Sequence, residues 1–344
     1  MTLRERAAVL WAEHVAKNTA RERDDVCAEV RQQFSDAEFV ELTAVCGLFG
    51  QSNRFQDSMR LPIEEQHEVD KIRNSVRADP ERLRAYVARL IENWPAEYPA
   101  AVGGGLSSQG GLPVIPAMMP APRVPLLDPE EAPLASVQFM VAAQRLLGGL
   151  PNSMRLWAYT PHAAKFFVPF FFAFEHDGAG SVLPATLRLM VMLKTHHQHR
   201  AHYLLAHHTV LGRAAGVTEA QLAALGAGRA HASPLFAPRE QAVIAWAAQV
   251  ACNTAKRDEK VFDELAKHFN DAEVVELTGL CAITSNADLI YNALRVPLES
   301  AAEIAALNGE VAIDAVRIKS YLRSVLADWP AEWPPLDAGR PAQT

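Results

Sequence analysis

The sequence predicts an all-α protein. In two segments, Ala8–Val15 and Val243–Val250, apolar residues recur at the i, i+3, i+4 spacing of a helix with one buried face. No segment alternates apolar and polar residues for long enough to predict a strand. The chain has 344 residues, of which 49 % are hydrophobic and 21 % charged. This composition is typical of a globular protein with a substantial core.

The first hundred residues recur 235 positions later. About 24 of the 61 residue pairs from Arg4 to Glu64 are identical at this fixed offset, far above chance. We interpret residues 1–99 as a helical half-domain that repeats residues 236–334. The shared positions include Trp11 and Trp246, Cys46 and Cys281, Pro62 and Pro297, and the motif Trp-Pro-Ala-Glu at 94–97 and 329–332.

Cap signals mark the individual helices. Ser35-Asp-Ala-Glu38 and its counterpart at 270–273 predict the starts of two long helices, which we expect to end near Pro62 and Pro297. Residues 187–211 predict one or two helices, ended by Gly216. Thr218 is expected to cap the helix that follows.

Glycine and proline separate the two parts of the chain. Residues 100–122 contain clustered glycines and prolines, which predict a mobile linker. The expected organisation is therefore a half-domain over 1–99, a linker over 100–122, a helical domain over 123–334 and a flexible tail over 335–344.

Charge and composition limit the partners that we expect. A net charge of −7 without a basic cluster argues against nucleic-acid binding. The longest apolar run, 166–174, is too short to span a membrane, and no secretory signal opens the chain, so we expect a cytoplasmic protein. The four cysteines form no CxxC or metal-type spacing and are expected to be buried and reduced.

The middle of the chain resembles a known family. The motifs that carry the resemblance are Arg123-Val-Pro-Leu-Leu-Asp-Pro, Leu150-Pro-Asn-Ser-Met-Arg, His208-Thr-x-x-x-x-Ala-x-Gly216 and Leu294-Arg-Val-Pro-Leu-Glu299. Residues 123–300 are similar to the carboxymuconolactone decarboxylase and alkylhydroperoxidase D superfamily. The resemblance implies an all-helical domain that works as a homo-oligomer, with pockets where helices and subunits meet. A dimer or trimer is expected, because the half-domain over 1–99 would stand where another subunit packs.

The reactive motif of that family is missing. Aligning its Cys-x-x-Cys-x-x-x-His helix on His208 places Ala201 and Leu204 at the cysteine positions and Leu189 at the position of a proton-transferring Glu. Peroxidase chemistry needs a reactive thiolate and a second thiol within reach. A thiol peroxidase is therefore the least favoured function, although the resemblance leaves a peroxidase-related protein as one alternative.

Six histidines lie within thirteen residues of this segment. One interpretation is acid–base chemistry, with His208, His207 and Tyr203 as catalytic candidates, since imidazole titrates near neutrality. A second is a divalent-metal site, for which the candidates are His196, His199 and His202. A third is a scaffold helix whose polar side faces water or a subunit interface. Otherwise no cofactor is expected.

Other candidates have two interpretations each. Arg200 is expected to hold a substrate carboxylate, and Asn53 with Arg54 to line a polar wall, unless the difference from the counterpart pair at 288–289 is surface drift. The segment 175–178, Glu-His-Asp-Gly, could be an acid–base cluster but is more typical of a solvated turn. The phenylalanines of 166–174 could line an apolar pocket or belong to the core.

Three functions remain open. The first is a lyase or isomerase that moves a proton on a small unsaturated or aromatic-derived acid or lactone, independently of redox chemistry, through His208 or His207. It predicts an enclosed pocket with Arg200 pointing inward. The second is a non-catalytic relative that binds a ligand or only assembles. The third is a metal enzyme, which requires three imidazoles at one point.

Overall fold

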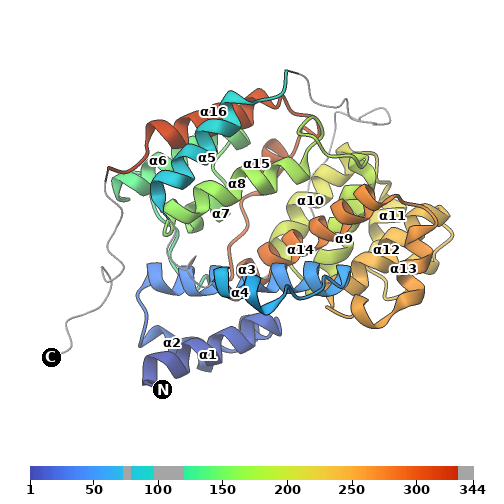
Figure 1. The fold of residues 1–344 in the computed structure, drawn as a ribbon, viewed down its shortest axis with the longest axis horizontal. Helices are drawn as coiled ribbons and strands as arrows, with labels where there is room; N and C mark the ends of the chain where they lie inside the picture. The colour runs from blue at the N-terminus through green and yellow to red at the C-terminus, as the bar shows by residue number, and fades with distance from the viewer. Residues whose placement is uncertain (73–78, 97–119, 332–344) are drawn as a thin grey trace.

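A computed structural model describes residues 1–72, 79–96 and 120–331 as a bundle of helices (Figure 1). The described part contains no β-strand, and the predicted all-α class is confirmed. The helices are α1 (Leu3–Ala16), α2 (Asp24–Arg31), α3 (Asp36–Met59), α4 (Gln66–Ile72), α5 (Pro80–Glu92), α6 (Leu134–Leu147), α7 (Asn152–Trp157), α8 (Pro161–Glu175), α9 (Ala185–His199), α10 (His202–Ala214), α11 (Glu219–Leu225), α12 (Pro238–Ala251), α13 (Glu259–Ala266), α14 (Asp271–Leu294), α15 (Ala301–Leu307) and α16 (Val316–Ala327).

The predicted caps are present. Ser35 and Asn270 each accept a hydrogen bond from the backbone N–H of the glutamate three residues on, and that glutamate bonds back to the cap residue. Thr218 caps α11 in the same way. The two long helices end before Pro62 and Pro297, as expected, at Met59 and Leu294. The starts of these helices could be predicted from the sequence because a capping box involves only residues within one helical turn.

Two segments of the chain fold alike. We call residues 3–59 the N-segment and residues 238–294 the C-segment. Each α-helix of the N-segment, α1, α2 and α3, has a counterpart of identical length exactly 235 positions later, namely α12, α13 and α14. A buried Trp–Thr hydrogen bond recurs as well, from Trp11 Nε1 to Thr43 Oγ1 at 2.9 Å and from Trp246 Nε1 to Thr278 Oγ1 at 3.0 Å.

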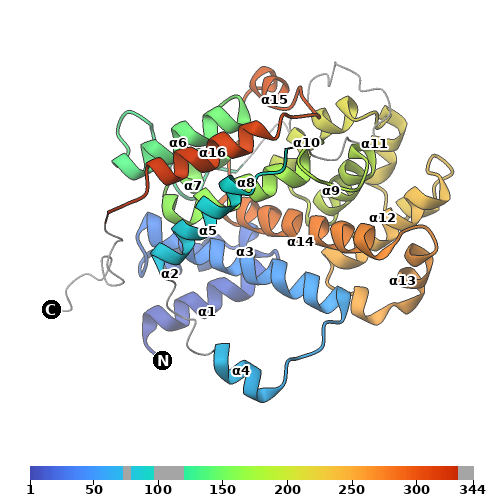
Figure 2. The same ribbon diagram turned by 45° about the horizontal axis from the view of Figure 1, so that its top comes forward.

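The two segments pack on each other with approximate twofold symmetry. Helices α3 and α14 run antiparallel, side by side (Figure 2), and the equivalent residues Gln51 and Asn286 meet across the contact at 3.2 Å. Arg60 donates to the carbonyl of Lys256 at 3.1 Å, and its counterpart Arg295 donates to the carbonyl of Arg21 at 3.0 Å. The N-segment therefore docks on the C-segment within one chain.

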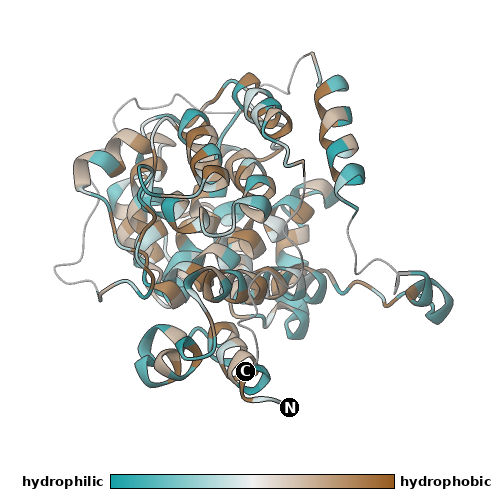
Figure 3. Cartoon of the chain, turned by 90° about the vertical axis from the view of Figure 1, so that its left-hand side faces the viewer, coloured by the Kyte–Doolittle hydropathy of each residue, from teal (hydrophilic) through white to brown (hydrophobic). Residues whose placement is uncertain are grey.

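The N-terminal part shares its core with the rest of the molecule. Buried Trp11 and Phe39 belong to the same hydrophobic cluster as residues of α6–α8, of α16 and of the end of α14. A second cluster joins α9, α12 and the first half of α14. Figure 3 shows that most helices carry hydrophobic and hydrophilic residues on different faces, as expected for helices that bury one side.

Some expectations have a different outcome or lie outside the described residues. The predicted linker falls almost entirely on residues 97–119, and the predicted tail 335–344 on residues 332–344, neither of which is described. The four cysteines are free, but only Cys27 and Cys281 are buried; Cys46 is half-buried and Cys252 is exposed, contrary to the prediction. No described helix is both long enough and apolar enough to cross a membrane.

Candidate active site

The histidine-rich segment is a helix–turn–helix, not one helix. Arg200 adopts a left-handed conformation with φ of 51°, which ends α9 and lets α10 begin at His202. The break turns the two ends of the segment toward different neighbours. His196, His199, His207 and His208 are buried, whereas His202 is exposed.

A cavity of about 80 Å³ lies between α8, α10, α14 and α15. It is smaller than the pockets that hold drug-sized ligands, so a ligand must be small. Its apolar wall includes Met154, Phe167, Phe171, Phe172, Leu204 and Leu307. Its polar groups include Glu175, His176, Tyr203, His207, His208 and Asn308.

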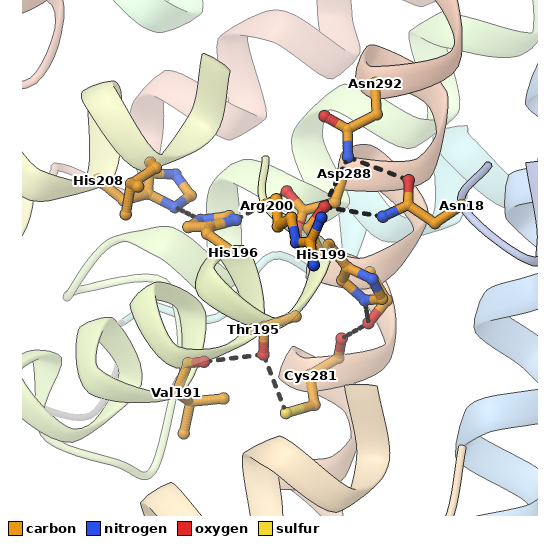
Figure 4. A network of polar contacts seen from close by, with 12 residues as sticks. Asn18, Val191, Thr195, His196, His199, Arg200, His208, Cys281, Asp288 and Asn292 are labelled. Carbon is orange, nitrogen blue, oxygen red and sulfur yellow. Dashed lines mark hydrogen bonds and ion pairs between the residues drawn. The ribbon is translucent and has the colours of Figure 1, made fainter. Parts of the chain in front are cut away.

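His208 forms the first imidazole–carboxylate pair of the cavity. Its Nε2 atom lies 2.8 Å from Glu175 Oε1, and both residues line the cavity. Its Nδ1 atom lies 2.7 Å from Nε2 of His196, whose Nδ1 atom lies 2.7 Å from Asp288 Oδ1 (Figure 4). The imidazole is thus held at both nitrogens, which fixes its orientation.

His207 forms a second pair on the same cavity. Its Nε2 atom lies 2.9 Å from Glu299 Oε2, and its Nδ1 atom lies 3.0 Å from Asn308 Nδ2. Tyr203 Oη donates to Glu299 Oε1 at 2.8 Å and accepts the backbone N–H of Ser153 at 3.2 Å. Consecutive positions on α10 therefore present two separate acid–base pairs to one space.

Burial determines the charge of several groups around the cavity. Burial raises the pKa of Tyr203 well above its ordinary value, and the charge of Glu299 adds to the rise, so the phenol stays neutral. Burial would also raise the pKa of Glu299, but the hydrogen bond and charge of His207, together with hydrogen bonds from Asn152 and Tyr203, outweigh it and the net pKa is lowered. Burial lowers the pKa of His176 to about 4, so this imidazole is neutral at pH 7.

The three predicted metal ligands do not meet. His196 bonds to Asp288 and His208, His199 Nε2 lies 3.0 Å from Ser285 Oγ, and His202 points to solvent. Among the described residues, no three His, Cys, Asp or Glu side chains converge as metal ligands would. The metal assignment is corrected because the turn at Arg200 separates His202 from the two buried imidazoles.

The three predicted substrate-binding residues lie away from the cavity. Arg200 is exposed on the turn, and Asn53 is exposed on α3. Arg54 is buried between the N-segment and the C-segment, where it donates to the carbonyl oxygens of Ala251 at 3.1 Å and Gly50 at 3.0 Å. The cavity is partly open and contains His208, but Arg200 does not point into it, contrary to the expectation.

No cysteine lines the cavity, and the environment of two of the thiols keeps them protonated and unreactive. Burial raises the pKa of Cys281 to about 12 and that of Cys46 to about 11, so neither is a thiolate at neutral pH. Ala201 and Leu204 occupy the positions that the resemblance gives to cysteines, and Leu204 lines the cavity. This arrangement offers no nucleophilic sulfur at the site.

None of the three carboxylates was a favoured candidate from the sequence, and only the segment of Glu175 was considered as an acid–base cluster. Glu175 belongs to the segment that we expected to be a solvated turn, yet α8 extends to it and its side chain reaches His208. Glu299 follows the proline that ends α14, and only the fold brings it to His207. In the sequence, Asp288 was marked only by its difference from Asn53, its counterpart in the repeat. Both predicted roles of the phenylalanines, in the core and in a pocket wall, are present: Phe167, Phe171 and Phe172 pack in the interior and line the cavity.

Comparison with known proteins assigns the segment that carries α8–α12. Residues 161–249 match the model of the carboxymuconolactone decarboxylase family. These residues belong to the carboxymuconolactone decarboxylase family. The family prediction is confirmed, while the N-terminal repeat stays a prediction because the match does not reach it. No curated protein matches the chain in sequence.

Distant structural likenesses extend over about half of the chain. The apo debrominase Bmp8 is 22 % identical, covers 54 % of this chain and 95 % of its own, and has a TM-score of 0.41. A variant of it in complex with 2,3,4-tribromopyrrole is 22 % identical over 55 % and 97 % of the two chains, with a TM-score of 0.44. The alkylhydroperoxidase AhpD core of an uncharacterized peroxidase-related protein from Ralstonia eutropha JMP134 is 19 % identical over 57 % and 100 %, with a TM-score of 0.46.

Proposed function

We propose that this family member is a lyase or isomerase that moves a proton on a small, uncharged, unsaturated or aromatic carbonyl compound, such as a lactone. One observation carries the proposal: His208 with its partner Glu175, and His207, which Glu299 holds from behind, line one small cavity. A reaction that removes a proton at one carbon and delivers it elsewhere can use one such group as the base and the other as the acid.

The two pairs suit different halves of such a reaction. Glu175 reaches the cavity and, when unprotonated, can take a proton from a carbon next to a carbonyl group. His207 Nε2–H and the neutral phenol of Tyr203 both bond to Glu299, so either one can donate to the oxygen on which charge develops if it exchanges its bond to Glu299 for one to the substrate. General acid–base groups placed in this way contribute about 10²–10⁴-fold each.

The lining of the cavity favours an uncharged substrate. No Lys or Arg side chain of the described residues lines it, whereas Glu175 does and Glu299 lies directly behind His207. A carboxylate there would meet negative charge without a cationic partner, which is costly in a site lined mainly by apolar side chains. Of the two substrate classes expected from the sequence, we therefore favour the lactone over the acid.

The aromatic side chains favour a flat, unsaturated molecule. Phe167 and Phe171 stack with ring centroids 5.7 Å apart, and Phe171 also stacks on His208 at 6.4 Å. An unsaturated ring placed against Phe171 would lie beside the imidazole of His208 and the carboxyl of Glu175. The non-catalytic alternative predicted these histidines in solvent or in a dry interface, so the cavity does not favour it.

Hydrogen exchange tests the proposal without requiring knowledge of the final product. A panel of small unsaturated lactones and matched free acids is incubated with the protein in D₂O, and loss of C–H signals is followed by NMR. We expect exchange with a lactone, and a loss of about 10²-fold or more in Glu175→Gln and His207→Asn. His231→Gln, at an exposed histidine, should leave the rate unchanged.

Two results would contradict the proposal. One is exchange on no member of the panel. The other is exchange that persists in both the Glu175 and the His207 variants, because the chemistry would then lie elsewhere.

A further inference from the structure

A chain of three short hydrogen bonds leads from the cavity into the interior. It runs from Glu175 Oε1 to His208 Nε2 at 2.8 Å, from His208 Nδ1 to His196 Nε2 at 2.7 Å, and from His196 Nδ1 to Asp288 Oδ1 at 2.7 Å. His196 and Asp288 have no solvent-exposed area, and His208 is 2 % exposed. The inner end of the chain is therefore sealed from water.

The hydrogen bonds permit only an ordered arrangement of protons. A neutral imidazole has one donor and one acceptor nitrogen, so two neutral imidazoles in series must point the same way. The pKa of His196 is lowered well below its ordinary value by burial and by the neighbouring His208, which keeps the ring neutral. The protons between Asp288 and Glu175 must then all shift together or not at all.

Asp288 has the environment of a neutral acid. Its Oδ2 atom is buried and has no hydrogen-bond partner among the described residues, which would be very costly for a charged oxygen. Burial raises the pKa of the carboxyl well above its ordinary value, and the charge of Arg54 from α3 opposes the rise only partly. The other titratable neighbours include His196, the protonated Cys281 thiol and the neutral phenol of Tyr291.

We propose that Asp288 is a buried proton store, which exchanges one proton with Glu175 through His196 and His208. In the resting state Asp288 carries a proton on Oδ1, both imidazoles carry theirs on Nε2, and Glu175 is unprotonated. Three concerted shifts move protons to His196 Nδ1, His208 Nδ1 and Glu175 Oε1. Asp288 is then ionised, Glu175 is an acid, and the net charge of the chain is unchanged.

The proton store at Asp288 adds a step to the proposed function and rests on that function. It allows Glu175 to begin a reaction either as a base or as an acid without taking a proton from water. His196 and Asp288 do not touch the cavity, so they act through His208 as positioning residues. The N-segment contributes as well, because Arg54 is the positive charge that acts on the buried end of the chain.

Spectroscopy of the ligand-free protein tests the store independently of any substrate. With ¹⁵N-labelled histidine, NMR shows which nitrogen of His196 and His208 carries the proton, and infrared difference spectra show whether a neutral carboxyl group is present. We expect Nε2–H on both rings and a carboxylic-acid C=O band that Asp288→Asn removes. Asp271→Asn, the same change at an exposed position of α14, should leave the band in place.

Glu175→Gln tests the exchange itself and keeps the proposal falsifiable if Asp288→Asn does not fold. The store predicts that in the wild type His196 and His208 exchange between the resting Nε2–H form and a minor Nδ1–H form; an amide at position 175 cannot accept the proton, so this exchange should be lost in Glu175→Gln. An ionised Asp288, Nδ1–H on His196 at rest, or identical imidazole signals in the wild type and Glu175→Gln would each overturn the store. If these signals appear but no lactone exchanges, the store stands and the proposed reaction fails.

Discussion

The N-segment and the C-segment have the same backbone fold, but different helices pack on them. Val45, Leu48 and Phe49 on α3 are 44, 50 and 63 % exposed. Their counterparts on α14, Leu280, Ile283 and Thr284, are all 0 % exposed. The difference arises because α9 packs along α14, and no described helix covers this face of α3.

The same difference decides where chemistry is possible. Asp288 and Glu299 belong to the hydrogen-bond networks of the cavity, whereas their counterparts Asn53 and Glu64 are exposed. A carboxyl group acquires an unusual proton affinity only when it is taken out of water and given specific partners. The two segments thus share the helical scaffold, whereas only the C-segment places its carboxyl groups in a reactive environment. Matched substitutions in the two segments can test this difference.

The largest contrast is expected in core packing. Ile283→Ala should lower the free energy of unfolding by about 2–5 kcal/mol, because it leaves a cavity between α14 and α9. Leu48→Ala, at the equivalent position of α3, should change it by less than about 0.5 kcal/mol, since that side chain is half exposed. Denaturant unfolding of both variants measures the difference. Equal losses would show that the exposed face of α3 is covered in solution.

The next contrast concerns pH. Burial lowers the pKa of His199 to about 3, with the charges of Arg54 and Arg21 adding to the shift. Below pH 6.5 the unfolded chain binds a proton at this position that the folded protein does not, so stability falls with pH from about 6.5 toward 3. His199→Asn should reduce this slope by up to about 1.4 kcal/mol per pH unit.

The matched control for this prediction is His67→Asn. His67 lies on α4 and is exposed, so the pH dependence of unfolding should not change. Thermal or denaturant unfolding between pH 7 and pH 4 provides the measurement. An unchanged slope in the His199 variant would mean that this imidazole is protonated in the folded state.

The smallest effects should be equal in the two segments. Ser35→Ala and Asn270→Ala each remove the cap of a 24-residue helix with the same capping box. Each should cost about 1 kcal/mol, because one backbone N–H at the helix start loses its partner. A clearly larger loss at either position would show that the cap there also supports tertiary packing.

Local signals in the sequence predicted the elements of the fold well. The capping boxes at Ser35 and Asn270, the turn at Gly216 and the spacing around Trp11 and Trp246 act within one helical turn, and each occurs in the structure as expected. The site was predicted only in part. His207, His208 and Tyr203 line the cavity, but Arg200 does not, since its left-handed conformation turns the segment there.

By itself, the sequence predicted the helical class, the boundaries of the two long helices, the family and a histidine-rich segment without cysteines. Only the tertiary structure decided which carboxylates meet the imidazoles, because Glu175, Asp288 and Glu299 lie 33, 92 and 92 positions from their histidine partners. Helix signals depend on neighbours along the chain. Proton affinity depends on burial and on partners in space, which no local pattern records.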